Sequence, residues 1–421
     1  MIENMQFDIP YGKEKITVNM PYQFEVLKPK KVVLRNEDEI IKKALDYPIE
    51  MASIKKFIKK SNRLLIIVND ASKPTPTSKI LEHIYPDLTE NSDFTFLVAT
   101  GSHRAPNNDE LQFIFGRFYD IFKDRILIHN ALDNENMIYL GETKAGTEVS
   151  INKLVFELGN VIVIGSVEPH YFAGCTGGRK SFTPGVASYK TIEMNHQYAL
   201  SEKANPFALK GNPVHDDLTD ALCLIKNVNI FSTQSILTSD NKIYDVVSGD
   251  IFKSYDYATK IAKELYCVPI KQKGNIVITV VPYPMDIDLY QSQNSFENAK
   301  LALEDDGIII IVTKCRMGVG KDAFIDLLCT AKTPQEVFDK LGNDYKLGYH
   351  KAARIAKIRT RSELWAVTDL DDEIIKKAMM KPYKSIQSAI NDAIKTIKEK
   401  GKQPKIFIMP SGNYTIPIIE K

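Results

Sequence analysis

Residues 161–185 read VIVIGSVEPHYFAGCTGGRKSFTPG, and this stretch decides the fold class. The run VIVIGS at 161–166 is short, apolar and rich in β-branched residues, and a polar, glycine-rich loop follows it at once. Such a run indicates a strand that is buried on both faces. Three similar runs precede it, with helical spacing between them: RLLIIVND (63–70), FTFLVAT (94–100) and RILIHN (125–130). Strands that alternate with helices predict βαβ units on a parallel sheet.

A second series of apolar strands begins near residue 275. Its strands read NIVITVVPY (275–283), GIIIIVTKC (307–315) and KIFIMPSG (405–412), with helical segments between them. The opening stretch alternates apolar and polar residues, which predicts a β-hairpin with its turn at 11–15. We therefore predict an α/β protein of two domains, each with a largely parallel sheet flanked by helices.

The domain boundary is predicted at VPIKQKG (268–274), where the alternation of strands and helices breaks. The first domain then covers residues 1–270, and the second covers residues 274–400. A second crossing at GKQP (401–404) would return the last strand, with residues 403–421, to the first domain.

Composition and charge exclude several classes of protein. The chain has 421 residues, which predicts two or three domains. Lys and Arg number 55 against 53 Asp and Glu, so a net charge of +2 gives no support for nucleic-acid binding. The apolar runs are far shorter than the about 18 residues of a membrane span, and the polar N-terminus lacks a signal-peptide pattern. The five cysteines are scattered and form no CxxC pair, which argues against disulfides and zinc. We expect a cytoplasmic protein with no membrane or nucleic-acid partner.

Unusual polar residues follow four of the predicted strands. They occupy the loops at 70–77, 99–104, 165–180 and 286–291. Ligands of open parallel sheets bind beyond the carboxyl ends of the strands, so these loops are expected to form a site. Because the last loop belongs to the second domain, we predict an active site in the interdomain cleft, with the second domain closing over the substrate.

His103 and His170 are candidate acid/base residues. Each follows a predicted strand directly, and the chain has only seven histidines. Imidazole titrates near neutral pH, which suits proton transfer. The alternative is that each caps or solvates its loop. Two bases at neighbouring strand ends favour the catalytic interpretation, since they can serve the two faces of one stereocentre.

The segment AGCTGGRKSFTPG at 173–185 predicts a ligand-binding loop. Gly177 and Gly178 permit backbone conformations that bring N–H groups close to a phosphate. The pattern matches neither a Walker loop nor GxGxxG. Lys180 is a phosphate-pairing or surface lysine in one interpretation, and the covalent anchor of a cofactor in the other.

His196, in EMNHQ, is a helix-surface histidine or a metal ligand. Imidazole binds nickel, copper and zinc, but no HExxH or carboxylate–histidine cluster accompanies it. A metal carried by an organic cofactor and bound by one histidine fits better than a site built from the protein alone.

Lys73 and Arg104 are candidate anion binders. Lys73 lies in a rigid Lys-Pro-Thr-Pro loop, and Arg104 directly follows His103. Tyr290 and Gln291 could reach the same pocket from the second domain, or serve only packing and loop hydrogen bonds.

With these motifs, the chain resembles the nickel-pincer-nucleotide-dependent lactate racemase family over essentially its whole length. The matching features are the loop from Asp70 to Lys73-Pro74, Ala99-Thr100-Gly101-Ser102-His103, Pro169-His170, Gly177-Gly178-Arg179-Lys180, Pro184-Gly185, Asn195-His196 and Leu289-Tyr290-Gln291. The spacing from His170 to Lys180 to His196 makes the match specific.

The resemblance implies a racemase or epimerase of a small 2-hydroxy acid, with nickel and the nickel-pincer nucleotide as cofactors. This nucleotide is a pyridinium-3-thioamide-5-thiocarboxylate mononucleotide. It would be attached covalently to Lys180, with Asp70, Gly177 and Gly178 as further cofactor contacts and His196 as the protein ligand of nickel. Separate maturation proteins make the cofactor, so protein produced without them is expected to be apoprotein.

The resemblance also implies a mechanism of proton-coupled hydride transfer. His103 and His170 would act as acid/bases on opposite faces of the substrate, while hydride moves between the substrate α-carbon and the cofactor ring. Lys73, Tyr290 and Gln291 would bind the substrate.

Two substrate-binding positions depart from the family pattern. The family's lactate racemases have an arginine where this chain has Lys73 and a lysine where it has Asn294. Arginine binds a carboxylate through two hydrogen bonds, whereas lysine is a point charge. A substrate larger or more polar than lactate is therefore expected.

Two other functions fit parts of the pattern. A non-catalytic cofactor-binding homologue would keep Lys180 and the glycine loop, but the presence of both His103 and His170 counts against it. An α/β nucleotide-dependent oxidoreductase should carry GxGxxG after its first strand, where this chain has NDASKPTPT.

Overall fold

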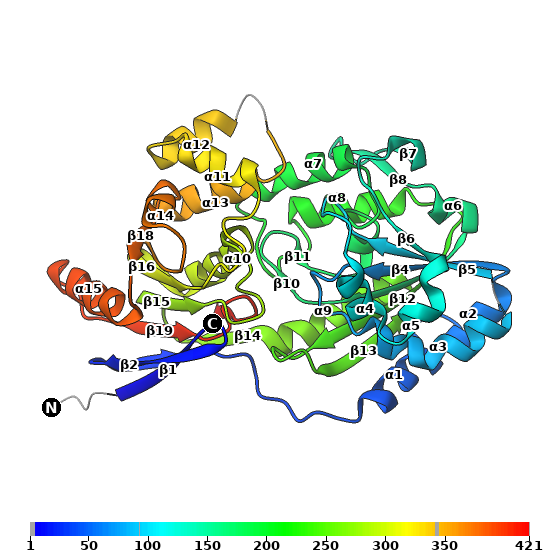
Figure 1. Cartoon of the computed structure of the whole chain (residues 1–421), viewed down its shortest axis with the longest axis horizontal. Coiled ribbons are helices and arrows are strands. Elements are labelled where there is room, and N and C mark those ends of the chain that lie inside the picture. Colours follow the sequence, from blue (N-terminus) through cyan, green and yellow to red (C-terminus); the bar gives the residue numbers. More distant parts are fainter. Residues whose placement is uncertain (1–4, 92, 342–344, 421) are drawn as a thin grey trace. The chain divides into compact units, whose positions relative to one another are not determined.

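The computed structural model describes residues 5–91, 93–341 and 345–420. The chain divides into two compact units: unit 1 comprises Met1–Lys30 and Tyr266–Lys421, and unit 2 comprises Lys31–Leu265 (Figure 1). Within the described ranges, every helix is too short or too polar to span a lipid bilayer.

Unit 2 is built on a six-stranded sheet in the order β13-β12-β9-β4-β5-β6. Its strands are β4 (Arg63–Asn69), β5 (Asp93–Ala99), β6 (Ile126–Ile128), β9 (Asn160–Ser166), β12 (Asn229–Leu237) and β13 (Ile243–Gly249). All neighbouring strands pair in parallel except β12 and β13. The four apolar runs that predicted this sheet form its adjacent strands β9, β4, β5 and β6, which confirms the expected parallel architecture.

Helices and small hairpins surround this sheet. The helices are α1 (Glu37–Asp46), α2 (Ile54–Lys60), α3 (Thr77–Asn91), α4 (Asn108–Phe115), α5 (Phe118–Phe122), α6 (Leu154–Leu158), α7 (Tyr189–Gln197), α8 (Pro213–Cys223) and α9 (Ile251–Tyr266). The hairpins are β7 (Met137–Glu142) with β8 (Glu148–Asn152), and β10 (Pro169–His170) with β11 (Gly174–Cys175). Alternate residues of the strands, such as Leu64, Ile66 and Val68, bury one face of the sheet against helices α1 to α5.

Unit 1 contains a second six-stranded sheet, in the order β18-β17-β16-β15-β19-β3, in which every pair is parallel. Its strands are β3 (Phe24–Val26), β15 (Gly274–Val280), β16 (Leu303–Val312), β17 (Glu363–Val367), β18 (Lys381–Tyr383) and β19 (Ile406–Met409). β1 (Met5–Tyr11) and β2 (Glu14–Met20) form the predicted hairpin, and β14 (Cys267–Ile270) pairs with β20 (Ile416–Ile419).

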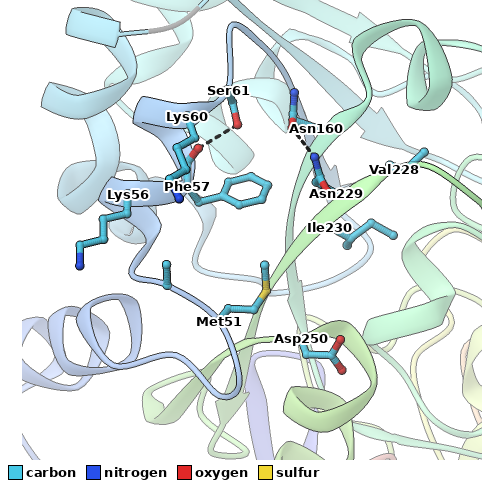
Figure 2. A pocket seen from close by; sticks show the side chains of 11 residues that line it. Met51, Lys56, Phe57, Lys60, Ser61, Asn160, Val228, Asn229, Ile230 and Asp250 are labelled. Carbon is cyan, nitrogen blue, oxygen red and sulfur yellow. Dashed lines mark hydrogen bonds between the residues drawn. The ribbon is translucent and has the colours of Figure 1, made fainter.

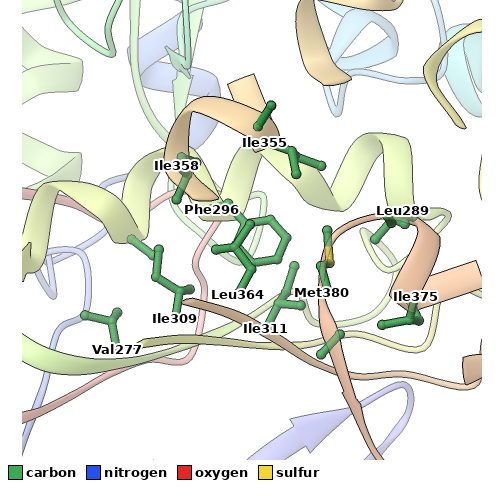
Figure 3. Packing of buried hydrophobic residues seen from close by; sticks show 14 of the residues in the cluster. Val277, Leu289, Phe296, Ile309, Ile311, Ile355, Ile358, Leu364, Ile375 and Met380 are labelled. Carbon is green, nitrogen blue, oxygen red and sulfur yellow. The ribbon is translucent and has the colours of Figure 1, made fainter. Parts of the chain in front are cut away.

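The two faces of this second sheet carry separate cores. One core packs α10 (Leu289–Ala299), α11 (Asp322–Cys329), α12 (Pro334–Leu341), α13 (Tyr349–Arg359) and α14 (Asp372–Lys377) on the sheet, with Phe296, Ile309 and Ile355 inside it (Figure 3). The other packs α15 (Ile386–Glu399) and the β1–β2 hairpin on the opposite face. The alternation of side chains along each strand produces the two cores.

The predicted return of residues 403–421 to the first domain is wrong. β19 pairs in parallel with β15 of unit 1, and Ile406 and Ile408 enter the core beneath α15. The assignment of the first 30 residues to the first domain is wrong for the same reason, because β3 pairs with β19. Short strands that complete a sheet from a distance leave no local pattern by which the sequence assigns them.

Candidate functional site

The sheet of unit 2 changes direction between β4 and β9. The chain passes from β4 to β5 and β6 on one side, then returns to place β9 on the other side of β4. Ligands of open α/β sheets bind at such a switch point, beyond the carboxyl ends of the strands. Asp70 and Lys73 follow β4, and Glu168 and His170 follow β9. Topology therefore brings these four residues to one edge of the sheet.

A chain of hydrogen bonds joins the two loops at this switch point. Asn69 Nδ2 donates to Thr75 Oγ1 (2.7 Å), which lies 2.9 Å from Ser166 Oγ. Ser166 Oγ donates to Glu168 Oε1 (2.9 Å), and Lys73 Nζ lies 3.8 Å from Glu168 Oε2. Such chains reinforce one another in a buried setting. Glu168 thus pairs with Lys73 at the switch point, a role that sequence reasoning missed.

Asp70 and His103 form a close pair. His103 Nδ1 lies 2.7 Å from Asp70 Oδ2, and the His103 side chain is 45% exposed. Burial alone would raise the pKa of Asp70, but the hydrogen bond and charge of His103, with Ser72 and Lys73, hold it below its usual range. Because an ionised carboxylate only accepts, Nδ1 of His103 carries a hydrogen and Nε2 presents a lone pair.

His170 is held by a different partner. Its Nδ1 accepts a hydrogen bond from the backbone N–H of Ala173 (3.2 Å). The ring lies edge-on to Phe172, with the ring centroids 4.5 Å apart. An N–H donor against Nδ1 places the hydrogen of the neutral ring on Nε2. The two histidines are therefore chemically inequivalent.

Phe172 links three of the predicted site residues. Its buried ring lies 4.5 Å from the ring of His170, 5.1 Å from the ring of His196 and 5.7 Å from Lys180 Nζ, measured to ring centroids. The structure therefore brings His170, Lys180 and His196 together around one aromatic side chain. Sequence reasoning did not identify Phe172; its only signal was its place between His170 and the glycine-rich loop.

Lys180 lies in a short 3₁₀ helix, Gly178–Ser181, and is half-buried. Burial, together with the like charges of Lys73 and Arg179, lowers the pKa of Lys180 well below its usual range. A lysine with a lowered pKa holds more of its amine neutral, and the neutral amine is the nucleophilic form.

The glycines before Lys180 are required by packing within the protein. A Cβ atom on Gly177 would lie 2.5 Å from Gln234 Oε1, and one on Gly178 would lie 2.7 Å from the ring of Tyr255. Both have positive φ, +79° and +52°. Gly178 N–H donates to Gln234 Oε1 (3.0 Å), so this donor already has a protein acceptor.

His196 lies near the end of α7, which begins at its N-cap Ser188. The preceding residue, Asn195, donates from Nδ2 to the buried carboxylate of Asp217 on α8 (2.7 Å). This bond fixes the helical turn that presents His196. In the part of the chain that the structure describes, no three His, Cys, Asp or Glu side chains gather as a metal site.

Tyr290, Gln291 and Asn294 lie on α10 of unit 1, which begins after the β15 end of the second sheet. Asp288 caps this helix by accepting from the backbone N–H of Gln291 (2.6 Å). Their spacing places Tyr290 and Asn294 on one face of the helix. That they meet the histidines in a cleft between the units stays a prediction.

Arg104 does not remain available as an anion binder. Both of its terminal nitrogens lie 2.7 Å from the carboxylate oxygens of Glu110, on α4. The Arg104 side chain therefore forms an exposed ion pair with Glu110 through two hydrogen bonds.

A separate pocket of about 440 Å³ opens at the other edge of the unit 2 sheet (Figure 2). Asn160 and Asn229, at the starts of β9 and β12, line it and are hydrogen-bonded to each other (3.0 Å). Lys56, Lys60 and Asp250 also line it, and none of the predicted site residues does.

Comparisons with known proteins cover almost the whole chain. The family model described as the lactate racemase N-terminal domain matches residues 11–206, and the lactate racemase C-terminal domain matches residues 270–416. A lactate racemase of Lactiplantibacillus plantarum is 30% identical, over 96% of this chain and 98% of its own length. One of Thermoanaerobacterium thermosaccharolyticum is 29% identical, over 96% of this chain and 97% of its own.

Solved structures agree with this relationship. The lactate racemase apoprotein from Thermoanaerobacterium thermosaccharolyticum has a TM-score of 0.90 and 28% identity, covering 99% of this chain and 100% of its own. A protein from Thermotoga maritima has a TM-score of 0.66 and 16% identity, covering 87% of this chain and 97% of its own. The second likeness concerns the fold alone.

Proposed function

Because the chain belongs to the lactate racemase family, we propose that it interconverts the two configurations of a 2-hydroxy acid by hydride transfer with a lysine-tethered nickel-pincer nucleotide. The chain is a racemase, and so an isomerase. The cofactor, the histidine roles and the identity of the acid are the parts that we propose. We also propose a cytoplasmic location, and cofactor maturation proteins as partners.

The observation that carries the mechanism is that the rings of His103 and His170 are held by different hydrogen-bond partners. Asp70 Oδ2 accepts from His103 Nδ1, whereas the Ala173 N–H donates to His170 Nδ1. His103 therefore presents the Nε2 lone pair of a base, and His170 in this contact presents an Nε2–H. In this proposal, His103 accepts the hydroxyl proton of one enantiomer at Nε2. His170 accepts that of the other enantiomer in the tautomer with its hydrogen on Nδ1, which gives up the Ala173 contact. Two histidines are needed because a single base cannot reach both faces of the stereocentre.

The residues around Phe172 fit the proposed cofactor. Lys180 has the lowered pKa of a reactive amine and would hold the nucleotide covalently. His196 lies against the same aromatic ring and would bind the nickel. When bound, the group would supply a hydride acceptor for the substrate α-carbon. Asp70 serves the cofactor only indirectly, by orienting His103, and Gly177 and Gly178 shape the loop that carries Lys180.

Lys73, Tyr290, Gln291 and Asn294 are proposed to bind the substrate. Lys73 is positioned by Glu168 at the switch point, beside the Asp70 loop. Its ammonium supplies a point charge for the substrate carboxylate. The partly exposed side chains of Tyr290, Gln291 and Asn294 on α10 supply further hydrogen bonds.

The test combines activity with composition. Protein made together with the cofactor-making enzymes should racemise at least one enantiopure 2-hydroxy acid, as followed by chiral chromatography. It should carry a covalent mass adduct and one nickel per chain, and Lys180→Ala should abolish both. An adduct without turnover would favour the non-catalytic cofactor-binding homologue. Turnover that needs a free nicotinamide nucleotide would favour the oxidoreductase.

A further inference from the structure

Lys351, on α13, lies against the proposed substrate-binding face of α10. Its Nζ lies 3.2 Å from Asn294 Oδ1 and 4.0 Å from the ring centroid of Tyr290, and it donates to the Tyr290 carbonyl oxygen. The Lys351 residue is 4% exposed. A buried ammonium therefore contacts two of the residues proposed to hold the substrate.

The packing of α13 on α10 fixes this arrangement. Ile355 and Ile358 of α13 lie beside Phe296 of α10 in the core of unit 1 (Figure 3). Glu297 lies one turn beyond Gln293 on α10, and its carboxylate accepts hydrogen bonds from Arg354 and Lys300. The Glu297 carboxylate is therefore engaged by two cations other than Lys351.

The contact with Lys351 sets the orientation of the Asn294 amide. A lysine ammonium has three donors and no acceptor, so only the oxygen of the amide can face it. Asn294 Nδ2 consequently points away from Lys351. Among the described residues, the structure records no acceptor for Nδ2, and the Asn294 side chain is partly exposed. The amide thus offers its N–H donors outward.

Lys321 adds a second positive charge at this place. Its Nζ lies 5.9 Å from the ring centroid of Tyr290, on the side of the loop that precedes α11. In the described part of the chain, one carboxyl faces these cations, that of Asp288 at the start of α10. Two lysines against one carboxyl leave the region around Tyr290 and Asn294 suited to an anionic group.

We infer that Lys351 is a positioning residue that holds the Asn294 amide as a hydrogen-bond donor to the carboxylate of the substrate. This inference rests on the proposed function and names a residue that neither the motif nor its spacing indicated.

The test measures binding apart from turnover. The probe is pyruvate, the smallest 2-keto acid that corresponds to a chiral 2-hydroxy acid, titrated calorimetrically into cofactor-loaded protein. Lys351→Met should weaken binding about 10- to 100-fold, the range for losing a hydrogen bond to a charged group. Lys351→Arg keeps donors at this place and should retain binding within about tenfold. Lys357→Met, six residues further along the same helix, should bind as the unsubstituted protein does.

A double-variant cycle separates positioning from general damage. Asn294→Ala leaves Lys351 in place and should weaken pyruvate binding to a similar degree. If Lys351 acts through Asn294, the double variant should bind no more weakly than the worse single variant. Additive losses, or normal binding by Lys351→Met, would overturn the inference. Chiral assays of the unsubstituted enzyme test the racemase proposal separately, since pyruvate binding without racemisation would contradict that proposal alone.

Discussion

The Nδ1 atom of His103 lies 2.7 Å from the Oδ2 atom of Asp70. This single contact fixes the ring tautomer, with the hydrogen on Nδ1. At His170, a backbone N–H rather than a carboxylate faces Nδ1. The two proposed bases therefore depend on different neighbours, which makes their roles separable by substitution.

Asp70→Asn should lower kcat about 10²- to 10⁴-fold, the usual cost of disabling a general base. The amide removes the negative charge and permits either ring tautomer of His103. The matched control is Ser72→Ala, because the Ser72 hydroxyl bonds the same carboxylate (2.5 Å) without touching His103. That variant should lose less than about tenfold. Racemisation by Asp70→Asn at the normal rate would remove Asp70 from the mechanism.

Lys180 should react as an amine more readily than an exposed lysine does. Burial and the charges of Lys73 and Arg179 lower its pKa, so an amine-selective acylating reagent should label it ahead of the exposed lysines. Peptide mapping of unloaded protein by mass spectrometry measures this without any turnover. Labelling of Lys180 no faster than that of Lys42, an exposed lysine, would contradict the lowered pKa.

The same shift predicts how stability changes with pH. The unfolded chain protonates Lys180 below about pH 10.4, whereas the folded protein resists protonation until a lower pH. The folded protein therefore loses stability as the pH falls from about 10.4 toward the lower pKa of the folded state. Lys180→Met removes that loss, so its Tm should exceed that of the unsubstituted apoprotein at pH 7, and the difference should shrink toward pH 10. A Tm difference that grows toward pH 10 would contradict a lowered pKa of Lys180 in the folded protein.

Much of this architecture was predictable from local patterns. The apolar runs before Asp70, His103 and His170 predict strands, and the parallel arrangement places their polar ends on one edge. Phe172 and Gln234 were not predictable, because their roles depend on which distant side chains meet their ring and amide. Lys351 escaped notice for the same reason: it lies 57 positions from Asn294 and joins it only through helix packing. The strand Ile406–Met409 was misassigned because strand pairing across a long stretch of chain leaves no local signal.

Arg354→Met should destabilise unit 1 by about 3 kcal/mol, since it leaves a buried carboxylate with one cation fewer. Glu297 is fully buried, and Arg354 Nη2 lies 2.5 Å from its Oε2. The control, Lys376→Met, breaks an exposed pair with Glu373 and should cost less than about 1 kcal/mol. Denaturant unfolding measures both. Equal costs would show that the buried pair adds no more to stability than the exposed pair.

The cost of Arg354→Met should also depend on pH. Burial alone would raise the pKa of Glu297, but the charges of Arg354 and Lys300 hold it at about 2. Its ion pairs therefore stabilise the protein fully above its usual pKa of about 4.3 and are lost as the pH falls from there toward 2. The difference in stability between Arg354→Met and the unsubstituted protein should therefore narrow as the pH falls. A difference that does not change with pH would show that Arg354 stabilises the protein through packing alone.

The substrate preference is the sharpest test of the binding residues. Lys73 is a point charge whose Nζ lies 3.8 Å from Glu168, so part of its attraction for a carboxylate is already offset. Lys351 restores a cation near Asn294, but it is buried behind an amide that offers donors rather than charge. Lactate reaches the Asn294 amide only through its carboxylate, which takes one of the two N–H donors, whereas a longer or more polar acid can also use the second. A panel of enantiopure 2-hydroxy acids should therefore rank such a member above lactate in kcat/KM.

Lys73→Arg combined with Asn294→Lys should shift the ranking toward lactate by about tenfold or more, the value of one charge-assisted hydrogen bond. Lactate in first place for the unsubstituted enzyme would contradict this assignment of specificity, and an unchanged ranking in the double variant would place it in other residues.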